Sequence, residues 1–377
     1  MYIEPYFFQF KEFLVVITTK DDPFVDDGTN LYPTDLYTDK GVYGTCGAAF
    51  HGRIFIADGN TLYWTAANTY NDWTTANDAG YKDDFVSDIV DMKVFGSYLV
   101  IWTKSDVYYL SGYDPTDFRF DQWGKMGVFS KYANCEFDNN IYTFTNGGLY
   151  PLEVTGDMAQ VRFVQALSDK IAPLLEEVDQ DRLNEVMVVP YEKRKQIWVY
   201  LPIKGKPGIY KAYILNMMNK ADSGSPLAWY TREGKPITHA IQHNGEIYSA
   251  TSDGKIYKED FGDTFDGDTI ESEIWFEPLS FNSARVKNCD EFKTFWDAQY
   301  NNKCKIGLKY NGKADNIKYR DIDLSSKKKT VADILSKTIP LKGEFSSIQF
   351  GIITDAADED YMFYGGTFIN LKETGEY

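Results

Sequence analysis

Six short apolar runs recur along the first 250 residues, each followed by a turn and, in most cases, a second short run. Successive runs are 41 to 55 residues apart, and they begin at Phe13, Ile54, Tyr98, Tyr142, Ile197 and Ile247. The turns combine glycine with aspartate or asparagine, as in Asp58-Gly59-Asn60, which tight hairpins need for positive φ angles. Strand, turn and strand at this period predict an all-β fold, a β-propeller of about six blades. Six unrelated hairpins in one large sandwich are the alternative.

Runs such as YLVIW at residues 98–102 are apolar on both faces, which is typical of strands buried between two layers.

One segment has apolar residues at the spacing of a helix instead of a strand. Residues 166–178 place apolar side chains at helical spacing, with Ser168 as an N-cap, and so predict a short helix. The apolar positions of this helix are Leu167, Ile171, Leu174, Leu175 and Val178.

The pattern changes near Asp260. The stretch EDFGDTFDGD is acidic and rich in glycine, as linkers are, and strand-like runs without the earlier period follow it. A polar excursion at Lys327–Lys329 interrupts them. We therefore expect two domains, a propeller over residues 1–265 and a small β-sandwich-like domain over residues 266–377.

Composition and charge narrow the functional classes. The 377 residues are 43% hydrophobic and 16% aromatic, and their formal net charge is −17. Such a charge argues against adhesion to nucleic acid or to an anionic membrane, and its simplest effect is solubility. No apolar run approaches 18 residues, and the first ten residues lack the basic start of a signal peptide. We expect a soluble protein made in a cytoplasm, without membrane insertion.

Candidate metal ligands are few. The four cysteines, Cys46, Cys135, Cys289 and Cys304, form no C-x-x-C motif, so buried free thiols are expected. His51 is expected in a turn. His239 and His243 would lie about 13 Å apart on a strand, too far for one metal ion. The acidic loop with Asp260, Asp263, Asp266 and Asp268 does not match an EF-hand, which leaves open a weak calcium site or a solvated linker.

No nucleophile, phosphate-binding or dinucleotide motif occurs in the sequence. Carboxylate pairs such as Asp88 with Asp91, or Glu136 with Asp138, are as expected of blade loops as of a glycosidase. The prediction is therefore a protein that is not an enzyme, with no catalytic, cofactor-binding or metal-binding residues and no cofactor.

Several segments resemble the β-propeller tail proteins of short-tailed double-stranded-DNA bacteriophages, including crAss-like phages. These segments are RIFIADGNTLYWTAANTYNDW, DIVDMKVFGSYLVIWTKSDVYYLSGYDPTDF and NNIYTFTNGGLYPLEV, with similar order and style continuing to about residue 300. The family includes tail nozzle, tail-tube B and packaged-DNA stabilisation proteins.

The resemblance implies a structural protein of the virion, in the tail or head–tail connector, assembled in the host cytoplasm. It implies a homo-oligomeric ring of six copies that contacts portal, adaptor and tail-fibre proteins. Genomic DNA would pass through the ring without sequence-specific binding. The first apolar run begins at Phe13, so the way in which the propeller closes is left open.

Two other classes compete with this interpretation. A carbohydrate-binding or carbohydrate-active propeller for receptor recognition would use exposed aromatic rings, and Trp64, Trp73 and Trp123 are the candidates. A cytoplasmic scaffold of the WD40 kind is less well supported, because the G-H…W-D signature is absent.

Overall fold

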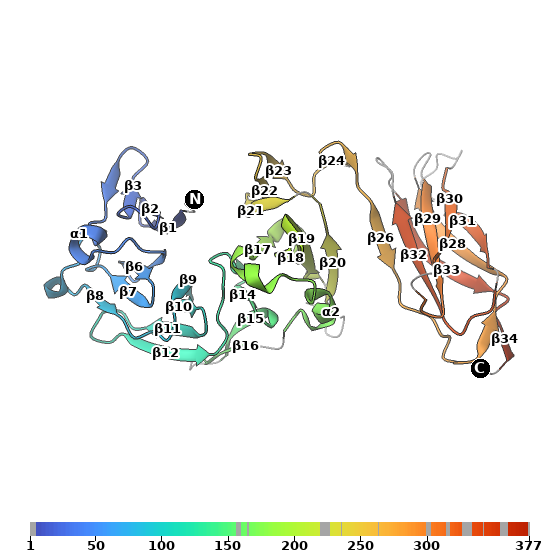
Figure 1. Ribbon diagram of the computed structural model, residues 1–377, viewed down its shortest axis with the longest axis horizontal. Coiled ribbons are helices and arrows are strands. Elements are labelled where there is room, and N and C mark those ends of the chain that lie inside the picture. The colour runs from blue at the N-terminus through green and yellow to red at the C-terminus, as the bar shows by residue number, and fades with distance from the viewer. Residues whose placement is uncertain are drawn as a thin grey trace. The chain divides into compact units, whose positions relative to one another are not determined.

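The computed structural model describes residues 5–155, 160–163, 166–218, 227–234, 236–262, 264–298, 303–313, 317–325, 334–341, 343–354 and 361–375. The fold is all-β, as the sequence predicts, and is built of many small antiparallel sheets. The chain divides into two compact units, Met1–Asp260 and Phe261–Tyr377, called here the N-terminal and C-terminal units (Figure 1). In the described residues, no helix has the length and apolarity that a membrane span requires.

The N-terminal unit contains six antiparallel sheets, each formed by strands consecutive in the sequence. Sheet 1 contains β1 (Tyr6–Phe10), β2 (Phe13–Ile17), β3 (Phe24–Asp26) and β4 (Leu31–Pro33). Sheet 2 contains β5 (Cys46–Phe50), β6 (Arg53–Asp58), β7 (Thr61–Trp64) and β8 (Gly80–Lys82). Sheet 3 contains β9 (Ile89–Phe95), β10 (Tyr98–Thr103), β11 (Val107–Ser111) and β12 (Arg119–Gly124).

The other three sheets repeat this arrangement. Sheet 4 contains β13 (Asn134–Phe137), β14 (Asn140–Thr145), β15 (Gly148–Thr155) and β16 (Gln160–Phe163). Sheet 5 contains β17 (Met187–Tyr191), β18 (Gln196–Ile203), β19 (Lys206–Asn216) and β20 (Ala228–Arg232). Sheet 6 has three described strands, β21 (Ile237–His243), β22 (Glu246–Thr251) and β23 (Ile256–Lys258).

Each of the six apolar runs lies in the second strand of one sheet, namely β2, β6, β10, β14, β18 and β22. Four of them, β6, β10, β14 and β18, are almost wholly buried, because they lie inside their sheets and pack on both faces. All eight residues of β18 are buried, for example. The hairpin before β6 turns at His51 and Gly52, both with positive φ, and such a turn favours glycine.

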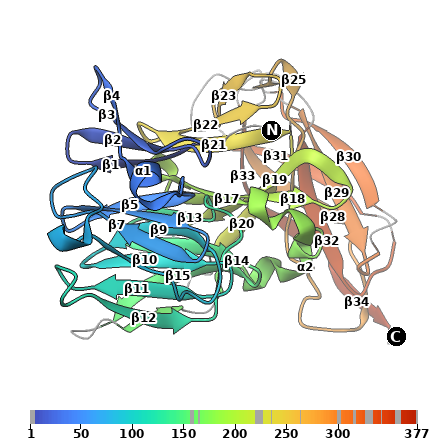
Figure 2. The ribbon, with the colours of Figure 1, turned by 60° about the vertical axis from the view of Figure 1, so that its left-hand side comes forward.

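Neighbouring sheets pack face to face through apolar side chains. Val15 and Ile17 of sheet 1 pack with Ile54 and Ile56 of sheet 2. The opposite face of β6 packs with sheet 3, since side chains alternate along a strand. Along the inner side of the series, first strand contacts first strand, β1 with β5, β5 with β9, β13 with β17 and β17 with β21 (Figure 2).

The helix expected over residues 166–178 is wrong in its extent. This segment forms a 3₁₀ turn, η2 (Asp169–Ile171), and one α-helical turn, α2 (Ala172–Leu175). Its ends bind neighbouring strands instead of extending the helix. The Ser168 hydroxyl accepts a hydrogen bond from the backbone N–H of Leu149, and Val178 forms a β-bridge with Ile203. The remaining short helices are α1 (Leu36–Lys40), η1 (Thr75–Asn77), η3 (Gln180–Glu185) and η4 (Glu192–Arg194).

The C-terminal unit begins with a two-stranded hairpin, β24 (Thr264–Phe265) and β25 (Asp268–Thr269). Its larger sheets have the orders β26-β32-β29-β30 and β31-β28-β33, and β27 pairs with β34. The bounds are β26 (Ser272–Trp275), β27 (Val286–Asn288), β28 (Glu291–Ala298), β29 (Lys303–Tyr310), β30 (Ile317–Asp323), β31 (Leu335–Pro340), β32 (Ile348–Thr354), β33 (Tyr361–Ile369) and β34 (Lys372–Gly375). Both larger sheets contribute to one core, with Phe292 and Trp296 from β28 beside Ile306 and Leu308 from β29. Lys327–Lys329 lie outside the described residues.

Candidate functional site

A depression of about 280 Å³ lies among the first strands of sheets 3 to 6. Each of these strands is at the edge of its own sheet, so one side of its backbone is unpaired within that sheet. The lining is mixed in character, with charged Lys93 and Glu136 beside apolar side chains from β17 and β21. The lining residues are Lys93, Asn134, Cys135, Glu136, Val188, Val189, Pro190, Ala240, Ile241 and Gln242.

Asp91, two residues before Lys93, joins three first strands. Its side chain is fully buried, and it accepts a 2.6 Å hydrogen bond from the Tyr6 hydroxyl of β1. The other carboxylate oxygen accepts a 2.9 Å hydrogen bond from Asn134 Nδ2 of β13. Sheets 1, 3 and 4 are therefore tied together by one carboxylate, which we call the Asp91 cluster.

The Asp91 cluster favours the protonated forms of the neighbouring Tyr6 hydroxyl and Cys46 thiol. Burial, followed by the charge of Asp91, raises the pKa of the Tyr6 hydroxyl well above its ordinary value. The same two causes raise the pKa of the Cys46 thiol, and burial raises the pKa of Cys135 to about 12. A thiol that stays protonated is a weak nucleophile, so these cysteines act as small apolar side chains. All four cysteines are free and buried, as expected from the sequence.

Asn134 also has an unused acceptor. Its Nδ2 atom is fixed by Asp91, while its buried Oδ1 atom has no hydrogen-bond partner within the described residues.

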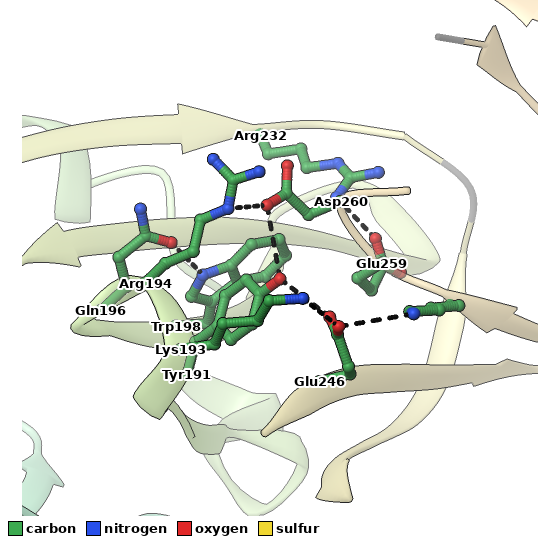
Figure 3. Close-up of polar contacts among 10 residues, drawn as sticks. Tyr191, Lys193, Arg194, Gln196, Trp198, Arg232, Glu246, Glu259 and Asp260 are labelled. Atoms are coloured by element: carbon green, nitrogen blue, oxygen red, sulfur yellow. Dashed lines mark hydrogen bonds and ion pairs between the residues drawn. The ribbon is translucent and has the colours of Figure 1, made fainter. Parts of the chain in front are cut away.

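A second polar cluster joins sheet 5 to the end of sheet 6 (Figure 3). Glu246, at the start of β22, accepts a 3.1 Å hydrogen bond from the Tyr191 hydroxyl and pairs with Lys193 and, at 3.4 Å, with Lys258. Asp260 pairs with Arg194 at 2.5 Å. The hydrogen bond from Lys193 is the main cause of a lowered Glu246 pKa, so this carboxylate is charged at neutral pH. We call this group the rim network.

Glu259 is the buried member of the rim network, only 5% exposed. It pairs with Arg232 of β20 at 2.5 Å and accepts a hydrogen bond from the Ser249 hydroxyl of β22. The Arg232 guanidinium also lies 5.5 Å from the centre of the Trp198 ring. Since Glu246, Glu259 and Asp260 all contact cations, the network anchors sheet 6 and the residue that ends the N-terminal unit.

The histidines lie where the sequence places them. His51 is in the turn between β5 and β6, where its ring stacks on Tyr113 with centroids 4.1 Å apart. His239 and His243 are both on β21, and the ring of His239 meets that of Tyr132 edge to face. In the part of the chain that the structure describes, no three His, Cys, Asp or Glu side chains gather as metal ligands.

The acidic residues of the expected linker are divided between the units. Asp260 belongs to the N-terminal unit and is held by Arg194, whereas Asp266 and Asp268 are exposed on the β24–β25 hairpin. Asp263 lies outside the described residues.

Of the four carboxylates considered as glycosidase pairs, Asp91 alone is buried; Asp88 forms an exposed 2.6 Å ion pair with Lys104, and Glu136 and Asp138 are exposed. Sequence reasoning missed the role of Asp91. The available signal was an aspartate inside the apolar strand IVDMKV.

The candidate ring-stacking tryptophans contribute mainly to the core. Trp64 is packed against Phe55 and Phe118, and Trp73 is 1% exposed and donates a 2.6 Å hydrogen bond to the carbonyl of Thr34. Trp123 is half-buried, with its ring 4.7 Å from that of Tyr109.

The chain matches no protein-family profile and no curated protein. Among solved structures it is similar to the extracellular domain of BT4673 from B. thetaiotaomicron, with a TM-score of 0.43, 15% identity and 67% of this chain covered. That alignment spans 31% of the BT4673 chain. It is also similar to the N-terminal domain of Nup159, with a TM-score of 0.43, 12% identity and coverage of 68% of this chain and 74% of that one. These low scores carry no argument about function.

Proposed function

We propose that the protein is a structural component of a bacteriophage virion, in the tail or head–tail connector. In this proposal the six sheets are the blades of a β-propeller, and the C-terminal unit is a small β-sandwich. The observation that carries the proposal is the sequential series of six antiparallel sheets, each packed face to face on the next through apolar side chains. The order of segments that resembles the phage tail proteins runs through this same series.

The net charge of the protein favours a channel that lets DNA pass over a surface that binds DNA. A net charge of −17 repels phosphate groups, so a wall built from this protein favours sliding of duplex DNA over its retention by contacts. In the rim network, the charged groups bind one another across sheets. The partners in this proposal are five further copies in a ring, with portal, adaptor and tail-fibre proteins next to it.

The oligomeric state and the DNA binding of the purified protein test the proposal. Native mass spectrometry and electron microscopy at physiological salt are expected to give a closed ring, six copies for the stoichiometry proposed here. Fluorescence anisotropy with a duplex of random sequence is expected to show no saturable binding. A protein that stays monomeric at every concentration and binds a glycan saturably would contradict the proposal and favour a carbohydrate-binding propeller.

A further inference from the structure

The C-terminal sheet with the strand order β26-β32-β29-β30 has two unlike faces (Figure 1). Even-numbered side chains, such as Ile306 of β29 and Ile352 of β32, are buried in the core of the unit. Odd-numbered side chains point the other way, because side chains alternate along a strand. On this second face, called here the outer face, the strand register aligns one residue from each strand in a row. The row consists of Trp275, Gly351, Gly307 and Tyr319.

The two glycines of the row seat the indole ring of Trp275 flat on the sheet. A Cβ atom on Gly351 would lie 2.6 Å from Trp275 Cδ2, and a Cβ atom on Gly307 would lie 2.6 Å from Trp275 Cη2. Neither glycine has a positive φ angle, so the backbone conformation does not require glycine at either position. Glycine inside a strand weakens the strand and often marks a close approach. The approach of the indole ring explains both glycines.

Polar side chains surround the ring on the outer face. The Nε1–H of Trp275 donates a 3.1 Å hydrogen bond to the exposed carboxylate of Glu273. The Lys309 ammonium lies 3.5 Å from the centre of the ring. Tyr319, at the far end of the row, is 50% exposed. An aromatic ring between a glutamate and a lysine is unlike the core of a protein–protein interface, where both charged residues are depleted.

Saccharides match this combination of groups. The C–H groups on one face of a sugar ring pack against an aromatic ring, and the sugar hydroxyls need polar partners at the edge of that ring. Glu273 is such a partner, and Tyr319 offers a second aromatic surface in the same row. Because two glycines and a hydrogen bond fix the plane of the indole, little freedom is lost on binding.

We propose that the outer face binds a neutral oligosaccharide, with one sugar ring stacked on Trp275 and a neighbouring sugar in contact with Tyr319. Glu273 accepts hydrogen bonds from hydroxyls of the stacked sugar. A neutral ligand is favoured over an acidic one, because the outer face also carries Asp321 and the protein has a net charge of −17.

Lys309 is the cover of this site. Its ammonium lies over the indole face that the stacked sugar would use, so ligand and ammonium compete for the same ring. The side chain is half-buried and has a flexible four-carbon stem, which allows the ammonium to move aside.

The inference goes beyond the proposed function and does not depend on it. The residues of the oligosaccharide site all belong to the C-terminal unit, whereas the series of six sheets belongs to the N-terminal unit. Oligosaccharide binding and ring assembly are measured separately, so either can fail while the other holds.

An array of immobilised oligosaccharides tests the site. The full-length protein is applied to neutral oligosaccharides of glucose, galactose, mannose and N-acetylglucosamine, with sialylated and sulfated oligosaccharides alongside. We expect saturable binding to a neutral oligosaccharide, and isothermal titration calorimetry with the strongest one gives its Kd. Trp275→Ala should abolish this binding. Tyr319→Ala should weaken it about three- to tenfold, and it keeps the test valid if Trp275→Ala unfolds, because Tyr319 is exposed.

Two further variants complete the experiment. Tyr364→Ala removes a 53% exposed tyrosine from β33, in the other large sheet of the same unit, and as the matched control it should bind like the wild type. Lys309→Ala should tighten binding about two- to fivefold, because the ammonium no longer competes for the indole.

Four results would overturn parts or all of the inference. Absence of saturable binding to every oligosaccharide contradicts the site itself. Unchanged binding in folded Trp275→Ala or in Tyr319→Ala shows that the oligosaccharide binds elsewhere on the protein. Binding confined to sialylated or sulfated oligosaccharides contradicts the choice of a neutral ligand. Weaker binding in Lys309→Ala contradicts the role of Lys309 as a cover.

Discussion

Asp91 and Glu259 are both buried carboxylates that join sheets of the N-terminal unit, but their partners differ. Asp91 accepts hydrogen bonds from the neutral groups of Tyr6 and Asn134, which are themselves largely buried. Glu259 pairs with Arg232, whose side chain is 29% exposed. The comparison teaches that the inner side of the series depends on buried hydrogen bonds from neutral donors to one carboxylate, while its rim depends on charges that water can partly replace.

Removing Asp91 should have the largest effect. Asp91→Ala removes the acceptor of Asn134 Nδ2 and the nearer acceptor of the Tyr6 hydroxyl, which keeps only a longer 3.3 Å contact with the Met92 carbonyl. Unpaired buried donors cost about 1–3 kcal/mol each. We expect a loss of about 3 kcal/mol in the free energy of unfolding, measured by urea denaturation followed by tryptophan fluorescence. Asp88→Ala, which removes an exposed ion pair, is the control and should cost about 0.5 kcal/mol or less. A loss below about 1 kcal/mol for Asp91→Ala would remove the distinction between the two clusters.

Glu259→Gln should have a smaller and more local effect. It removes the 2.5 Å ion pair between Glu259 and Arg232, but Arg232 reaches solvent and keeps its position beside Trp198, so we expect a loss of about 2 kcal/mol in the free energy of unfolding. Hydrogen exchange should become faster in β21–β23 and stay unchanged in sheet 2. Equal acceleration in both sheets would show that the rim network does not act locally.

Acid should weaken the rim network through Glu246. The hydrogen bond from Lys193 is the main cause of the lowered pKa of Glu246. A folded-state pKa below the ordinary 4.5 gives stability that is present above pH 4.5 and lost as pH falls through the folded value. We expect the urea midpoint to fall between about pH 5 and pH 3, and less so in Glu246→Gln. Identical pH profiles for the variant and the wild type would contradict this assignment.

Lys193→Gln should have the smallest effect. The Lys193 side chain is 63% exposed, and Glu246 keeps Tyr191 and Lys258 as partners. We expect no measurable change in the urea midpoint at 1 M salt, where exposed ion pairs are screened. A clear loss of stability that persists at high salt would show that the exposed part of the rim network is as important as Glu259.

The repeated strands could be predicted because their signal is local. Each apolar run needs only its own turn and neighbours to form a hairpin, and all six runs are second strands in the structure. The length of the short helix was overestimated because the local pattern does not include contacts with distant strands. The spacing of Leu167, Ile171 and Leu174 is helical, but Ser168 and Val178 bind strands β15 and β18, and those contacts end the helix early.

The candidate site could not be predicted in the same way. The Asp91 cluster unites β1, β9 and β13 through hydrogen bonds between residues 85 and 43 positions apart, and no local pattern encodes such a meeting. Asp88 and Asp91 look equivalent in the sequence, yet one pairs with Lys104 on the surface and the other is fully buried. The rim network likewise depends on Tyr191 and Glu246 coming together across two sheets.

The sequential order of strands has a consequence for how the chain forms during synthesis. Within each of sheets 1 to 6 every strand pairs with a sequence neighbour, so each sheet can assemble soon after its own residues leave the ribosome. In the C-terminal unit, β26 pairs with β32 and β27 pairs with β34. The pair of Ser272 with Thr354 and the pair of Val286 with Gly375 can therefore form only after the later residue has been synthesised. Translation should therefore yield the N-terminal sheets one at a time, and the C-terminal unit only after residues as late as Gly375 have been added.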